Sequence, residues 1–118
     1  MNRYENWKPN KYRNKKVVID GIKFDSQAEG IRYKELRLLE RAGLIKDIKL
    51  QTSFELQPSF KKNGKTIREI TYRSDFDYIT KDGRHIIEDV KGMETPEFKI
   101  KKKLFEYKYP DLEIKIIK

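Results

Sequence analysis

Residues 73–91 read RSDFDYITKDGRHIIEDVK. Aromatic and β-branched residues recur on both sides of the turn sequence Lys81-Asp82-Gly83, which predicts a half-buried β-hairpin at the centre of a sheet. Aspartate is disfavoured in strands, and a buried carboxylate needs a partner. The positions of Asp75 on the first strand and Asp89 on the second therefore indicate a functional role for both residues.

The length of the turn decides whether these carboxylates meet, because side chains alternate between the two faces of a sheet. A three-residue loop over Lys81-Asp82-Gly83, with Gly83 in the left-handed conformation, pairs residue 80 with residue 84 and places Asp75 opposite Asp89. Lys91 then lies on the same face. A two-residue turn at Asp82-Gly83 also suits the sequence but separates the carboxylates. We predict the three-residue loop or another loop of odd length.

Two carboxylates and an amine in this arrangement have a specific chemical use. Mg²⁺ prefers oxygen ligands, usually one or two carboxylates together with water and phosphate oxygens. A lysine next to such an ion orients or deprotonates a water molecule, or neutralises charge that develops on a phosphate. Asp75, Asp89 and Lys91 thus supply the parts for metal-assisted hydrolysis of a phosphodiester.

The rest of the sequence predicts a mixed α/β (α+β) domain over residues 16–118, with helices packed on a mixed central sheet of about four to five strands. The expected elements are an N-terminal β-hairpin over 16–24, a helix opening at 25–29, strands over 44–50 and 53–57, a turn at 61–64, a β-rich stretch over 66–80, a strand over 85–90, a helix over 95–107 and a strand over 112–117. Ser26 and Glu29 have the spacing of a capping box. The predicted apolar stripe of the first helix comprises Ile31, Leu36, Leu38, Leu39 and Ala42.

Basic residues exceed acidic ones, and the excess lies at the two ends of the chain. The 118 residues include 28 Lys and Arg against 19 Asp and Glu, for a net charge of +9. Residues 17–97 are balanced, whereas 1–16 and 98–118 carry the surplus. Basic ends on a neutral body indicate a polyanionic partner, most commonly nucleic acid. We expect DNA contacts from a basic arm over residues 1–15 and from further basic side chains, the full set being Lys8, Lys11, Arg13, Lys15, Lys16, Arg73, Lys99, Lys102 and Lys103.

The composition excludes several other classes of protein. No cysteine is present, which excludes a disulfide scaffold, a thiolate metal site and a cysteine nucleophile. His85 is the single histidine, so a site with several histidine ligands is excluded within one chain. No apolar run approaches the ~20 residues of a membrane span, and the N-terminus lacks the apolar stretch of a signal peptide. We therefore expect a cytoplasmic protein with no membrane partner.

The acidic hairpin resembles the PD-(D/E)xK nuclease motif. More narrowly, the chain is similar to a family of small phage- and prophage-encoded proteins catalogued as a domain of unknown function. The similarity covers roughly residues 11–118 and rests on Asp25-Ser26-Gln27-Ala28-Glu29, Leu56-Gln57-Pro58, Tyr72-Arg73-Ser74-Asp75-Phe76 and Glu88-Asp89-Val90-Lys91-Gly92. One position departs from the motif, because Ser74 stands where the motif name has proline.

The resemblance implies a restriction-endonuclease-like core and a role for each motif residue. Asp75 and Asp89 would be the metal-binding carboxylates, and the Val90 carbonyl would be a further ligand. Lys91 would assist the attacking water. Glu29 matches an acidic residue on the first helix that holds a metal through water. The implied metal is Mg²⁺, with Mn²⁺ able to substitute.

The expected function is that of a Mg²⁺-dependent DNA endonuclease of phage type. It would nick DNA as a monomer, or cut branched DNA as a Holliday-junction resolvase does if it forms a symmetric homodimer. Other phage replication, recombination or packaging proteins are further expected partners, in the cytoplasm of a bacterial host. The alternatives are a non-catalytic DNA-binding or replication accessory protein and an RNA-binding basic protein; the latter explains the charge but not the acidic hairpin.

Several of the singled-out residues also have a purely structural interpretation. Glu29 is either a metal residue or only the capping partner of Ser26. Asp77 and Glu88 are expected to make structural contacts or to contact the residues that hold the metal, and His85 is expected to be an exposed turn residue. Gln57 either reaches the site or simply ends a strand.

Overall fold

The computed structural model describes residues 15–118 and contains two helices and ten strands over that range, and all ten strands are paired in ladders. The elements are β2 (Val17–Ile19), β3 (Ile22–Phe24), α1 (Gln27–Arg41), β4 (Ile45–Leu50), β5 (Ser53–Gln57), β6 (Phe60–Lys62), β7 (Lys65–Ile67), β8 (Ile70–Arg73), β9 (Phe76–Thr80), β10 (His85–Val90), α2 (Pro96–Lys108) and β11 (Ile114–Ile117). Neither helix is long and apolar enough to cross a membrane.

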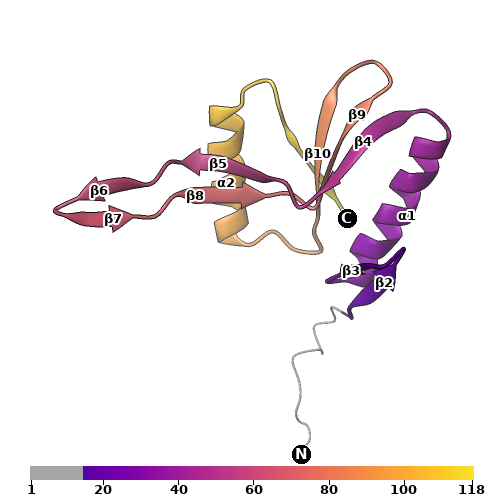
Figure 1. Ribbon diagram of the computed structural model, residues 1–118, viewed down its shortest axis with the longest axis horizontal. Helices are drawn as coiled ribbons and strands as arrows, with labels where there is room; N and C mark the ends of the chain where they lie inside the picture. Colours follow the sequence, from indigo (N-terminus) through magenta and orange to yellow (C-terminus); the bar gives the residue numbers. More distant parts are fainter. Residues whose placement is uncertain (1–14) are drawn as a thin grey trace, which may run out of the picture.

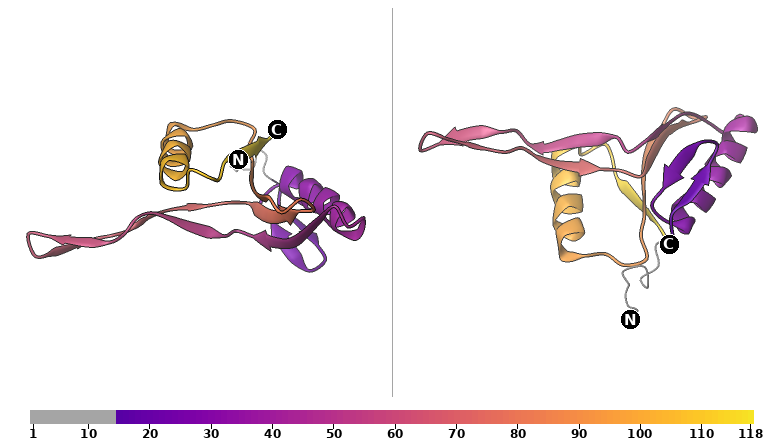
Figure 2. Two further views of the ribbon diagram at one scale, coloured as in Figure 1. Left: turned by 90° about the horizontal axis from the view of Figure 1, so that it is seen from above. Right: turned by 60° about the horizontal axis from the view of Figure 1, so that its bottom comes forward.

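The central sheet has four strands in the order β11-β10-β9-β4. Strand β10 runs parallel to β11 and antiparallel to β9, and β4 runs antiparallel to β9. This arrangement confirms the predicted mixed sheet, flanked by helices and preceded by the β2–β3 hairpin. Figures 1 and 2 show α1 with that hairpin on one side of the sheet and α2 on the other.

The β9–β10 hairpin has the predicted even register. Glu88 pairs with Phe76 and His85 pairs with Ile79, and the Thr80 amide donates to the Arg84 carbonyl at 2.8 Å. Residues 81–83 form the loop, and Gly83 has a φ of +90°, which a residue with a Cβ rarely adopts. Continued by one more pair, this register places Asp75 opposite Asp89.

Each face of the sheet is covered by its own hydrophobic core, because adjacent residues of β9 and β10 point to opposite faces. The core under α1 contains Phe24, Tyr33, Leu36, Ile45, Phe76 and Tyr78. The core under α2 contains Tyr72, Ile87, Phe98, Phe105 and Ile114.

The predicted apolar stripe of α1 is partly wrong. Leu36 is fully buried, but Ile31 and Leu38 are 55% and 60% exposed. The face that meets the sheet and the hairpin instead carries Gly30 and Tyr33. A Cβ on Gly30 would lie 2.8 Å from side-chain atoms of the β2–β3 hairpin, so this glycine permits the close contact that fixes the orientation of the helix.

The long hairpin formed by β4 and β9 continues beyond the sheet as a two-stranded arm (Figure 1). Both strands bend at the same level, where the Gln51 amide donates to the Asp75 carbonyl and the Ser74 amide donates to the Thr52 carbonyl. Beyond the bend β5 pairs with β8, and β6 pairs with β7. The predicted β-rich stretch over 66–80 is confirmed but divides into β7, β8 and β9, and the predicted turn over 61–64 is wrong in its bounds. Only Asn63-Gly64 forms the turn, because both residues have the positive φ that a two-residue hairpin turn requires.

A buried ion pair ties α1 to β10. The Arg32 guanidinium donates from Nε and Nη2 to the two Glu88 carboxylate oxygens at 2.8 and 2.6 Å, and the Tyr78 hydroxyl donates to the same carboxylate. Glu88 is fully buried. Because α1 also carries Glu29, this contact sets the position of Glu29 relative to the end of β10.

Arg32→Met is expected to lower the free energy of unfolding by about 3–5 kcal/mol, because it leaves the Glu88 carboxylate buried without its cation. Arg37→Met on the same helix removes an exposed pair with Glu40 and is expected to cost no more than about 1 kcal/mol. Urea unfolding at pH 7 measures both. Equal losses in the two variants would contradict the role given to the buried pair.

Candidate active site

Four predicted residues meet at the end of the sheet from which the arm leaves. Asp75 lies in the bend between β8 and β9, Asp89 is the penultimate residue of β10, and Lys91 directly follows that strand. Glu29 lies in the first turn of α1. Three separate segments of the chain thus bring three carboxylates and an amine to one place.

Asp75 is held by the backbone at the end of β10. Its Oδ2 atom accepts a hydrogen bond from the Val90 amide at 2.7 Å, and its own amide donates to the Glu88 carbonyl at 3.1 Å. The side chain is half-buried. These two bonds fix the carboxylate next to Asp89 while leaving its second oxygen without a protein donor among the described residues.

Asp89 is the most buried of the three carboxylates, at 4% exposure. The Tyr72 hydroxyl donates to its Oδ2 atom at 2.6 Å, and Lys91 Nζ lies 3.4 Å from its Oδ1 atom. Lys91 Nζ also lies 4.5 Å from the centre of the Phe98 ring, a cation–π contact. The sequence analysis missed Tyr72 as a partner, because its position depends on the bend between β8 and β9.

Two of the carboxylates, Asp75 and Glu29, have raised pKa values. The pKa of Asp75 is raised to about 7, chiefly by burial and also by Glu29 and Asp89, while the hydrogen bond from the Val90 amide and the charge of Lys91 act in the opposite direction. Burial likewise raises the pKa of Glu29, with contributions from Asp25 and Asp89. A divalent cation would relieve this mutual repulsion, because it stabilises the ionised form of every carboxylate around it.

The four side chains are open to solvent through cavities that share lining residues. One cavity of about 170 Å³ is lined by Glu29 and Asp75, and one of about 640 Å³ by Glu29, Val90 and Lys91. A third, of about 320 Å³, is lined by Asp89, Lys91 and Arg73. Glu29 and Lys91 each line two of the three, so the cavities surround one spot on the surface.

The donor set has the chemistry that Mg²⁺ prefers, namely carboxylate oxygens and the backbone carbonyl of Val90. Within residues 15–118, however, no three acidic or histidine side chains stand close enough together to hold a metal. Asp89 contacts Lys91 and Tyr72 instead. Mg²⁺ usually retains several water ligands, so one or two direct carboxylates with water between the ion and Glu29 suit this spacing.

The structural interpretations of neighbouring residues are largely confirmed. Asp77 accepts from Thr52 and contacts His85 Nε2 at 2.8 Å, and Glu88 forms the ion pair with Arg32. The expectation that His85 is an exposed turn residue is wrong, because it lies in β10 and is half-buried against Asp77. Gln57 pairs with Ile70 in the arm and lines none of the three cavities.

Glu29 combines its two predicted interpretations. Its amide donates to Ser26 Oγ at 3.1 Å, and Ser26 Oγ lies 3.3 Å from Glu29 Oε2, which confirms the capping contact. The same carboxylate lines two of the cavities around the cluster. Capping therefore positions this side chain without removing it from the candidate site.

The predicted DNA contacts fall into three groups. Lys8, Lys11 and Arg13, with most of the predicted arm over 1–15, lie outside the described residues, whereas Lys15 and Lys16 are exposed. Arg73 is exposed next to Asp89 and Lys91. On α2 the exposed predicted contacts are Lys99 and Lys103. Lys102 is half-buried and pairs with Glu106 at 3.0 Å, so its charge is already compensated.

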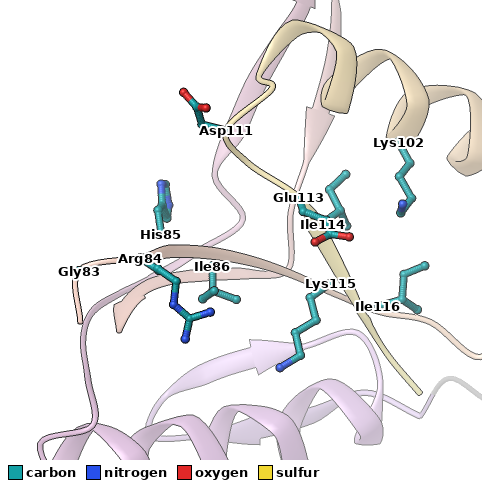
Figure 3. Close-up of a pocket in the computed structure, with 10 residues that line it drawn as sticks. All are labelled: Gly83, Arg84, His85, Ile86, Lys102, Asp111, Glu113, Ile114, Lys115 and Ile116. Carbon is teal, nitrogen blue, oxygen red and sulfur yellow. The ribbon is translucent and has the colours of Figure 1, made fainter. Parts of the chain in front are cut away.

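A larger cavity of about 890 Å³ lies at the opposite end of β10 (Figure 3). Its lining includes Arg84 and His85 from the start of that strand, Lys102 from α2 and Lys115 from β11. Acidic side chains, Asp111 and Glu113, are interspersed with these basic ones. This cavity is lined by none of the three carboxylates Glu29, Asp75 and Asp89. We therefore place the candidate site at the other end of β10, although the cavities there are smaller.

The fold and this cluster define a small mixed α+β protein with an acidic site at the end of its sheet. The chain belongs to the family described as protein of unknown function (DUF1064), which it matches over residues 9–118. No match was found among curated proteins or among solved structures.

The raised pKa of Asp75 predicts a specific pH dependence of stability. Between about pH 4 and pH 7 the folded protein holds a proton on Asp75 that the unfolded chain has released, so this group makes the free energy of unfolding decrease as pH rises. Asp75→Asn removes this titration, so the variant should gain stability relative to the wild type from pH 4.5 to pH 7.5. Urea unfolding at the two pH values measures the difference.

The exposed Asp111→Asn variant is the matched control for this measurement. Its stability relative to the wild type should change little over the same range. A difference between Asp75→Asn and wild type that is independent of pH would contradict the raised pKa.

Proposed function

We propose that this protein is a Mg²⁺-dependent DNA endonuclease that hydrolyses phosphodiester bonds. The observation that carries the proposal is the convergence of Glu29, Asp75, Asp89 and Lys91 at one solvent-accessible spot. A protein that only binds DNA gains nothing from carboxylates facing phosphate, since like charges repel. The resemblance of Asp75, Asp89 and Lys91 to the PD-(D/E)xK motif supports the same conclusion, as does the order of helices and strands.

In this proposal Asp75 and Asp89 hold the metal together with the Val90 carbonyl, and Glu29 holds it through water. When bound, Mg²⁺ or Mn²⁺ supplies Lewis-acid activation of the phosphate and of a water molecule. Lys91, 3.4 Å from Asp89, leaves that carboxylate to orient the attacking water and to offset charge on the phosphate. Tyr72 keeps Asp89 in place through its 2.6 Å hydrogen bond.

The reaction consumes one water for each bond that is cut. The water oxygen forms the new bond to phosphorus, one P–O bond of the strand breaks, and the leaving oxygen takes up a proton. One end therefore keeps the phosphate and the other becomes a hydroxyl. A single site cuts a single strand, so a monomer nicks, whereas a symmetric homodimer could resolve a branched DNA such as a Holliday junction.

Exposed basic side chains near the cluster suit a DNA substrate. Arg73 lines the same cavity as Asp89 and Lys91 and would contact a phosphate next to the one that is cut. This activity fits a phage-type protein that works in the cytoplasm of a bacterial host, with phage replication, recombination or packaging proteins as further partners.

A non-catalytic DNA-binding accessory protein is the second candidate. The observation that favours it is the contact of Asp89 with Lys91 and Tyr72, which occupies groups that metal and water would need. A chain that has lost catalysis would retain such a closed arrangement.

The decisive experiment compares cleavage of supercoiled plasmid and of four-way junctions in Mg²⁺, Mn²⁺ and EDTA. Metal-dependent cleavage by the wild type should fall by on the order of 100-fold or more in Asp89→Asn, because a ligand is lost. Glu113→Gln, an exposed carboxylate in the cavity at the opposite end of β10, is the control and should cleave normally.

Binding of the metal is measured separately through its effect on unfolding. Mg²⁺ should raise the unfolding midpoint of the wild type and not that of Asp89→Asn, since a ligand of the folded state stabilises by mass action. DNA binding without cleavage in either metal, together with no shift of the midpoint, would support the accessory protein instead.

A further inference from the structure

We propose that the end of the arm, residues 58–70, is a second DNA-binding element that enters the major groove of the duplex flanking the cleaved phosphate. We call these residues the arm tip. The choice of DNA rests on the proposed function. The location of the contact rests on the exposure, charge and geometry of the tip itself.

The arm tip is not packed against the body of the protein. Every residue from 58 to 70 is exposed, and strands β6 and β7 pair only with each other. Three large apolar side chains remain in water here, since Phe60, Ile67 and Ile70 are 45%, 40% and 37% exposed. A lone two-stranded ribbon is marginally stable, and its open edges promote aggregation, so its presence calls for a partner that covers it.

The charge of the tip identifies that partner as a polyanion. The tip contains Lys61, Lys62, Lys65 and Arg68 against one acid, Glu69, and none of the four cations pairs with a carboxylate of residues 15–118. Lys62 lies directly opposite Lys65 in the ladder. Like charges in that relation destabilise a hairpin, and phosphate groups on either side would remove this cost.

The shape of the tip suits a DNA groove. The major groove of B-DNA is about 12 Å wide and admits a two-stranded β-ribbon, whereas that of duplex RNA is too deep and narrow for side chains to reach. The turn at Asn63-Gly64 keeps the end of the ribbon no wider than its two strands. Phe60 and Ile67 form a cross-strand pair, and Lys61 points to the opposite face, so lysines can reach phosphates on both walls of the groove.

The base of the arm is fixed to α2, which sets the direction of the tip. The Phe54 ring contacts Phe105 edge-on at 5.1 Å between centroids, and the Tyr109 hydroxyl donates to the Glu55 carbonyl at 2.8 Å. Figure 2 shows the arm crossing α2 and extending away from the body. The tip is therefore carried at a defined position relative to the site.

The length of the arm matches the repeat of the duplex. The arm starts beside Asp75, and an extended strand from Thr52 to Asn63 spans roughly 36 Å. One turn of B-DNA also spans about 34–36 Å. A duplex whose phosphate lies at Asp75 thus offers its groove to the tip about one turn away.

The test measures DNA binding without cleavage, in EDTA, on a fluorescent 30-base-pair duplex by anisotropy over a range of salt concentrations. The tip variant is K61Q/K62Q/K65Q. We expect affinity to fall at least tenfold and the slope of log affinity against log salt to become shallower by about 2–3, because each lost phosphate contact removes about 0.9. The matched control K34Q/K46Q/K81Q removes three exposed lysines from the body and should change affinity less than threefold.

Each outcome decides between named alternatives. Equal affinity and equal salt slope for the tip variant and the control would overturn the inference. If the tip variant instead changes the oligomeric state in sedimentation while DNA affinity is unchanged, the tip binds a second copy of this chain and the inference also fails. Equal unfolding midpoints establish that the variants fold. Because DNA binding is measured in EDTA, a failure to observe cleavage in the nuclease assay does not affect the comparison of affinities.

Discussion

The loop over Lys81, Asp82 and Gly83 sets the register of β9 against β10, and the composition of both hydrophobic cores follows from that register. With an odd number of loop residues, Phe76 and Tyr78 face α1 while Asp77 and Ile87 face the other way. A loop one residue shorter would exchange the faces of one strand, so that either Phe76 and Tyr78 would leave the core under α1 or Ile87 would leave the core under α2. The same shift would move Asp75 away from Asp89. Packing and the candidate chemistry are therefore fixed by one constraint on the backbone.

The acidic residues of this hairpin fall into two groups that differ in their hydrogen-bond and charge partners. Glu88 and Asp77 are buried and are each matched by specific donors, Arg32 and Tyr78 for the first and Thr52 and His85 for the second. Asp75, by contrast, is half-buried beside further carboxylates, and its pKa is raised. A fully matched carboxylate contributes to folding, whereas one placed among like charges fits the metal-binding role that we propose for Asp75.

The sequence predicted the features that depend on neighbouring residues, such as helix caps and turns. It did not predict the features that depend on contacts between distant segments. Capping by Ser26, the glycine turn at Gly83 and the Thr95 start of α2 follow from backbone chemistry within a few residues, and all are present. The bend that divides the stretch over 66–80 was not predictable, because it arises from hydrogen bonds between two strands far apart in the sequence. The exposure of Ile31 and Leu38 has a similar cause, since contact of Gly30 with the hairpin selects the buried face of α1. Tyr72 was missed for the same reason as the bend.

The bend at Gln51 and Asp75 separates a part of the chain that tolerates changes in length from a part that does not. Residues added symmetrically on either side of Asn63-Gly64 would lengthen the ladder by about 7 Å for every two residues per strand, and every pairing below them would be preserved. A single residue added at the bend would shift the register of β9. The length of the arm can therefore change during evolution without altering the geometry of the candidate site.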